Sequence, residues 1–78
     1  MNIYTQNFRA TCPRNNCTVD YRLKIESTRT IMVEDIQAAV STLEGFHEDH
    51  ADKLLALFGG KQTLTAHHHG TDIETVRP

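Results

Sequence analysis

The residues best suited to chemistry are a cysteine followed by proline, Cys12-Pro13, and a cluster of histidines and acids, His47-Glu48-Asp49-His50. A thiol at a strand end can act as a nucleophile where its surroundings stabilise the thiolate. Residue type alone favours a plain buried position for Cys12, because free cysteine is among the most buried residue types. The histidine and acid cluster fits either a site or an ordinary helix start, where backbone N–H groups favour negative charge.

Two further carboxylates and a metal are candidates. Glu34, just before an expected helix, suits either hydrogen bonds from a purine-like amidine edge or the role of a first-turn acid. Asp20 lies on the charged side of an expected strand, where pairing with a neighbouring base is the ordinary role. A zinc ion would need Cys12, Cys17 and two of the five histidines, but a Cys-x4-Cys spacing is wider than that of most zinc knuckles. We therefore expect no metal site.

Length and composition limit the class of protein in which these candidate residues can act. The 78 residues, 38% of them hydrophobic, fit a single domain over 1–78. A core this small makes a homo-oligomer the expected state. No apolar run approaches the roughly 20 residues that span a bilayer, and Met1–Arg9 lacks the core of a signal peptide, so we expect a cytoplasmic protein without membrane contact. The basic residues are scattered, which predicts no nucleic-acid surface.

Residue periodicity predicts the elements that position the candidates. Two alternating segments joined by the Pro13–Asn16 turn predict a hairpin, and apolar residues at helical spacing then predict two helices, ended by glycines. Two shorter alternating segments follow. The expected elements are strands 3–11 and 19–26, helices 34–44 and 47–58, and strands 62–67 and 73–76. The order β-β-α-α-β-β predicts an α+β fold with an antiparallel sheet and both helices on one face.

Four short motifs, in this order, resemble the 7-cyano-7-deazaguanine (nitrile) reductases of queuosine biosynthesis: Ala10-Thr11-Cys12-Pro13, Val19-Asp20, Met32-Val33-Glu34 and Phe46-His47-Glu48-Asp49. That family has the tunnelling fold (T-fold), whose unit is β-β-α-α-β-β. The resemblance, from about Phe8 to Arg77, implies a short, divergent T-fold enzyme. It implies NADPH-dependent reduction of the nitrile of a small deazapurine to the aminomethyl base, in a homo-oligomer with sites between subunits.

The resemblance also implies a role for each candidate residue. Cys12 would attack the nitrile carbon to give a covalent thioimide, and Asp20 would handle the proton. Glu34 and Glu48 would hold the edge of the deazaguanine, with His47 beside the reacting carbon as a proton donor or positioning group. A nitrile is a weak electrophile, so a thiolate with a nearby acid is what the addition requires.

The chain departs from the family pattern at several places, two of which concern the proton transfer and the cofactor. Asp20 lies one residue further from the cysteine, and Gln37-Ala38-Ala39 replaces lysines associated with the phosphates of NADPH. Three alternatives stand beside reduction. An amidine-forming relative would capture the thioimide with ammonia or another amine and would need no nicotinamide. A non-catalytic T-fold module would bind a purine, a pterin or a protein partner. The third alternative is a zinc-stabilised interaction domain.

Overall fold

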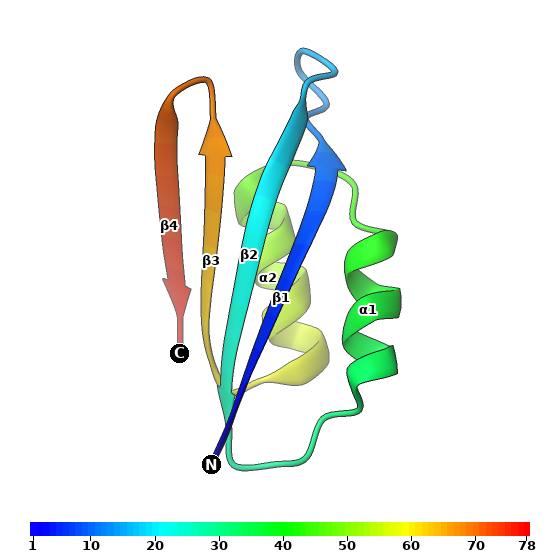
Figure 1. Ribbon diagram of the computed structural model, residues 1–78, viewed down its shortest axis with the longest axis vertical. Coiled ribbons are helices and arrows are strands. Elements are labelled where there is room, and N and C mark those ends of the chain that lie inside the picture. The colour runs from blue at the N-terminus through cyan, green and yellow to red at the C-terminus, as the bar shows by residue number, and fades with distance from the viewer.

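The computed structural model describes residues 1–78, which form one four-stranded sheet with two helices. The elements are β1 (Asn2–Thr11), β2 (Thr18–Ser27), α1 (Val33–Ser41), α2 (His47–Phe58), β3 (Lys61–His68) and β4 (Thr71–Arg77). The strands are antiparallel to their neighbours in the order β1-β2-β3-β4, and both helices lie on the same side of the sheet (Figure 1). The predicted α+β fold and its β-β-α-α-β-β order are confirmed.

The last hairpin is longer than its sequence alternation predicted. His68 pairs with Thr71, and the two residues between them, His69 and Gly70, have φ angles of 51° and 80°. A two-residue hairpin loop of type I′ requires positive φ at both positions, which glycine adopts freely. The tight turn brings β4 into register from Thr71, two residues before the predicted start of that strand.

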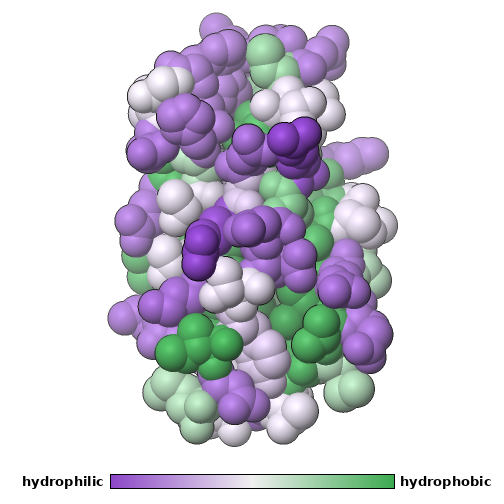
Figure 2. All heavy atoms as spheres, viewed as in Figure 1, coloured by the Kyte–Doolittle hydropathy of each residue, from purple (hydrophilic) through white to green (hydrophobic).

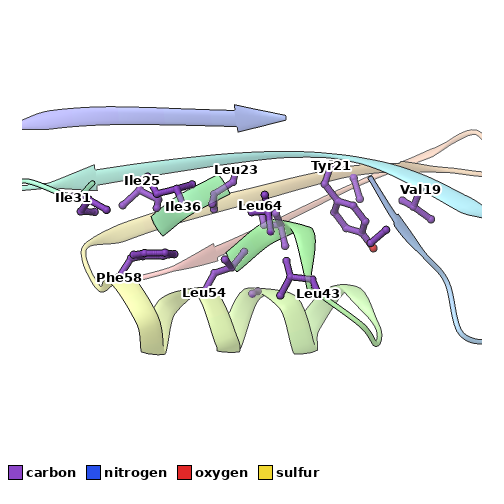
Figure 3. Packing of buried hydrophobic residues seen from close by; sticks show 14 residues of the cluster. Val19, Tyr21, Leu23, Ile25, Ile31, Ile36, Leu43, Leu54, Phe58 and Leu64 are labelled. Carbon is purple, nitrogen blue, oxygen red and sulfur yellow. The ribbon is translucent and has the colours of Figure 1, made fainter. Parts of the chain in front are cut away.

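One side of the sheet carries the core. Along β2, buried residues alternate with exposed ones, and the buried set faces the helices. Leu54 of α2 and Leu64 of β3 complete the centre of this layer, each 2% exposed or less. Figure 3 shows these side chains between the sheet and α2. The buried hydrophobic cluster comprises Ala10, Val19, Tyr21, Leu23, Ile25, Ile31, Ile36, Val40, Leu43, Ala51, Leu54, Phe58, Leu64 and Ala66.

The other side of the sheet has no covering element. Figure 2 looks onto this side, and hydrophilic residues cover much of it. Arg9 of β1 and Asp20 of β2 form an ion pair there, and the Nδ1 of His67 lies 2.6 Å from Oδ1 of Asp72 between β3 and β4. A polar, solvated face is what a sheet with one buried side requires. Neither helix is long and apolar enough to cross a membrane.

Candidate functional site

A cavity of about 400 Å³ opens between the end of the β1–β2 hairpin, the start of α2, and β3 and β4. Its wall includes Cys12, His47 and Glu48, three of the five predicted site residues. The volume is in the range of small-molecule sites. Cys12 and Glu48 lie 36 positions apart in the chain, so only the folded domain brings the thiol and the carboxylate to one place.

Cys12 is held by backbone hydrogen bonds just beyond the last residue of β1. Its N–H donates to the carbonyl of Cys17 at 2.8 Å, and its own carbonyl accepts from the N–H of Asn16 at 2.9 Å. Pro13 has no N–H to continue the ladder, and Asn16 turns the chain with a φ of 57°. The Cys12 side chain is half-buried against the core and its thiol is free. The turn thus fixes the backbone of Cys12 while its side chain lines the cavity.

The start of α2 separates the roles of two adjacent acids. The carboxylate of Asp49 accepts a hydrogen bond from the N–H of Phe46 at 2.9 Å, which ties the residue before the helix to its first turn. Asp49 therefore serves the helix start. Glu48 lines the cavity instead, at the helix end where backbone N–H groups stabilise negative charge.

His47 is 7% exposed, and its ring is fixed from β4, where its Nε2 lies 2.8 Å from Oγ1 of Thr75. Burial lowers the pKa of His47 below 6.5, and the charge of Arg77 lowers it further, while the charge of Glu48 opposes the shift. The imidazole is therefore neutral at pH 7. A neutral ring held by Thr75 fits the predicted positioning role better than that of an imidazolium proton donor.

Asp20 lies on the opposite side of the sheet from the cavity. Its neighbours Val19 and Tyr21 face the helices, so the alternation of β2 turns Asp20 toward solvent. Its side chain is 67% exposed, and its Oδ1 accepts a hydrogen bond from Arg9 Nε at 2.7 Å. The depression that Asp20 lines, of about 580 Å³, lies on the uncovered side and contains no thiol. This is the ordinary role of a strand carboxylate paired with a neighbouring base.

Glu34 is exposed in the first turn of α1 and does not line the cavity. Within one chain it is an ordinary first-turn acid. The single chain therefore does not bring Glu34 to the other candidate residues, and the contact between Glu34 and a substrate stays a prediction.

Tyr21 is a cavity residue that the motifs did not identify. It is 6% exposed, and its ring stacks on Phe8 and on His47 with centroids 4.9 and 5.7 Å apart. The ring of His50 approaches at 5.3 Å, nearly perpendicular. Burial raises the pKa of the Tyr21 phenol, and the negative charges of Cys12 and Glu48 raise it further. The strict alternation of β2, which places Tyr21 on the inner side, is the sequence signal that could have found it.

The side chains weighed as zinc ligands are not gathered at one place. No group of three or more His, Cys, Asp or Glu side chains is arranged to hold a metal ion. The rings of His68 and His69 instead meet the Nδ2 of Asn15 at 3.4 and 3.1 Å, which links the two hairpin turns. The first turn of α1 carries two acids, and its last turn carries no basic residue.

Comparison with known proteins places the fold. No family model matches the chain, and no curated protein matches it. The chain is similar to a solved structure, the archaeosine synthase QueF-like protein in its apo form, with a TM-score of 0.68 and 17% sequence identity. The similarity covers 97% of this chain and 89% of that one. The chain therefore has the tunnelling fold of a QueF-like protein, as the ordered motifs predicted.

Proposed function

We propose that this protein attacks the nitrile of 7-cyano-7-deazaguanine, or of a related deazapurine, through Cys12 and forms a covalent thioimide. The observation that carries the proposal is the meeting of Cys12, His47 and Glu48 in one cavity of suitable size. These residues belong to two of the motifs that resemble the nitrile reductases. The similarity of the fold to a QueF-like protein supports the same reading.

Each of these side chains has a different role in the proposed reaction. Cys12 supplies the nucleophile, and its sulfur bonds to the nitrile carbon while one π pair of the C≡N bond moves to nitrogen. Glu48 accepts hydrogen bonds from the N–H groups of the deazaguanine edge, which aims the nitrile at the thiol. His47, neutral and tied to Thr75, fixes the wall beside the reacting carbon. In an oligomer with sites between subunits, Glu34 of a second copy would add another acceptor.

For the fate of the thioimide, we propose capture by ammonia or another amine. The amine adds to the thioimide carbon, the Cys12 thiolate leaves, and an amidine forms without any change of oxidation state. This fate is favoured because α1 holds Glu34 and Asp35 and no basic residue in its last turn, a poor surface for the phosphates of a dinucleotide. The structural neighbour is itself an archaeosine synthase. Reduction by NADPH, the main reaction of the family that the motifs resemble, is the second candidate.

Intact-mass spectrometry tests the covalent step. Wild type, Cys12→Ala and Cys17→Ala are incubated with 7-cyano-7-deazaguanine without cofactor. We expect a gain of the mass of the base on wild type and Cys17→Ala and none on Cys12→Ala. If neither wild type nor Cys17→Ala gains mass and calorimetry detects no binding, the proposal is wrong. Binding without any adduct would instead identify a non-catalytic module.

A second assay separates the two fates. The wild-type adduct, freed of excess base, is mixed with an ammonium salt or with NADPH, and the released base is identified by its mass. We expect the amidine with ammonium and no aminomethyl base with NADPH. Release of the aminomethyl base would establish reduction and overturn the preference for amine capture.

A further inference from the structure

The nitrile nitrogen needs a proton when Cys12 attacks, and Asp20 faces away from the cavity. Asp20 is paired with Arg9 on the uncovered side of the sheet. We propose that Tyr21 is the catalytic acid that protonates the nitrile nitrogen, an inference that rests on the proposed attack by Cys12. The role implied for Asp20 by the motif resemblance thus passes to the next residue of the strand.

The position of Tyr21 follows from the strand register. Cys12 continues the inward-facing side of β1, and Tyr21 lies on the inward-facing side of β2, opposite Phe8. Both Cys12 and Tyr21 line the cavity. Figure 3 shows the Tyr21 ring leaning along β2 toward Val19, the end of the strand that adjoins the turn after Cys12. The phenol thus leans toward the end of β2 that pairs with Thr11, the residue before Cys12.

The Tyr21 hydroxyl is available to a bound molecule. The core buries four polar side-chain atoms without a partner, His47 Nδ1, both ring nitrogens of His50 and Gln62 Oε1, and the phenol oxygen is not among them. It makes no hydrogen bond within the chain, whereas the hydroxyl of Tyr4 accepts one from the N–H of Ile31 at 3.0 Å. A hydroxyl that is open to a cavity and free of protein partners can donate to a substrate atom.

The surroundings of Tyr21 hold it in position and keep it protonated. The rings of Phe8 and His47 stack against the Tyr21 ring, and the ring of His50 approaches it nearly perpendicular, so the three neighbours restrict its movement. Burial raises the pKa of the phenol, and the charges of Cys12 and Glu48 act in the same direction. Ionisation of the thiol therefore raises the pKa of the Tyr21 phenol and keeps it protonated before the attack. The attack then places a negative charge on the substrate nitrogen, which accepts the proton.

The proton transfer balances as a single addition. The step starts from the Cys12 thiolate, whose proton has already passed to solvent. The Sγ–C bond forms, one π pair of the nitrile becomes a lone pair on nitrogen, the phenol O–H bond breaks, and an N–H bond forms. The nitrogen anion of an attacked nitrile is a far stronger base than a phenoxide, so the transfer is downhill. The ammonium ion that supplies the amine returns a proton to the phenoxide as it enters. No oxidant or reductant takes part.

Tyr21→Phe tests the inference because it keeps the stacked ring and removes only the hydroxyl. Adduct formation is followed over time by intact-mass spectrometry, and binding of the base is measured by calorimetry in a Cys12→Ala background. We expect Tyr21→Phe to slow adduct formation about 10²- to 10⁴-fold, the usual contribution of a general acid, with binding changed less than about threefold. Tyr4→Phe, which removes a hydroxyl from the same sheet outside the cavity, is the matched control and should react at the wild-type rate.

The outcomes separate this inference from the proposed function. Adduct formation by Tyr21→Phe at the wild-type rate, or an equal loss in Asp20→Asn, overturns the role of Tyr21 and leaves Cys12 as nucleophile. Absence of the adduct in wild type overturns both. A fluorinated tyrosine at position 21, which keeps the fold and makes the phenol more acidic, should move the alkaline limb of the rate profile to lower pH. An unmoved limb contradicts proton donation even if Tyr21→Phe is slow for structural reasons.

Discussion

The two histidines at the start of α2 make the stability of the domain depend on pH. His50 is 1% exposed, and neither of its ring nitrogens has a hydrogen-bond partner. Burial lowers the pKa of His50, the charges of His47 and Lys53 lower it further, and the charge of Asp49 opposes them. Burial likewise lowers the pKa of His47. Both rings therefore fold in the neutral form.

The direction of the pH effect follows from proton binding. In the unfolded chain both histidines titrate near 6.5, while in the folded domain they titrate at lower pH. Well above pH 6.5 neither the folded nor the unfolded chain binds these protons, so the two neutral rings make their full contribution to the free energy of unfolding. As the pH falls below 6.5 the unfolded chain binds more protons, and the free energy of unfolding decreases. The decrease ends once the pH falls below the folded pKa of each ring.

The size of the effect is limited by the number of protons. As the pH falls below 6.5, each histidine that stays neutral in the folded domain lowers the free energy of unfolding by at most about 1.4 kcal/mol per pH unit. The two histidines together lower it by at most about 2.7 kcal/mol per pH unit. A domain of this size has a total stability of roughly 4 to 12 kcal/mol. Moving from pH 7 to pH 5.5 is therefore expected to remove a substantial part of it.

Urea unfolding followed by circular dichroism, at fixed protein concentration and at half-unit steps from pH 7.5 to 5, measures this dependence. His50→Leu removes one buried titrating ring and its two unpaired nitrogens, so we expect its slope below pH 6.5 to be about half that of wild type. His69→Asn, which removes an exposed histidine at a turn position that asparagine also adopts, should keep the wild-type slope. Equal slopes for wild type and His50→Leu would refute the reasoning.

Three further changes test the packing that holds the cavity in place. Leu54→Ala empties a fully buried position in α2 and is expected to lower the free energy of unfolding by about 2–5 kcal/mol, measured by urea unfolding. Gly60→Ala places a Cβ 2.5 Å from the carbonyl oxygen of Glu26 at a φ of +71°, so it should lower the melting temperature by more than Gly70→Ala, whose Cβ has open space at a φ of +80°. Arg29→Met removes the Nη2 donor to the carbonyl of Phe58 at 2.7 Å and should cost about 1–3 kcal/mol by the same urea assay, whereas an unchanged midpoint would contradict a role in ending α2.

The sequence determined the type and order of the elements. The alternation of Val19–Glu26 predicted a strand with one buried side, and the helical spacing before Gly45 and Gly59 predicted two helices, because both periods follow from local backbone geometry. The ends of some elements differ from those that the sequence predicted, such as the end of α1 at Ser41 and not at residue 44. The structure extends β4 back to Thr71 because hydrogen bonding across a tight turn continues past the alternating residues.

For the candidate site, the sequence alone determined which residue types could do chemistry, and only the tertiary structure decided which of them meet. Cys12, His47 and Glu48 share one cavity, while Asp20, which is one residue further from the cysteine than the family pattern has it, lies on the other side of the sheet. A one-residue change of spacing in a strand moves a side chain to the opposite side. The alternation of side chains along β2 therefore places Tyr21 at the cavity and Asp20 away from it. Which of the two adjacent residues lines the cavity depends on the position of β2 in the sheet and not on residue type.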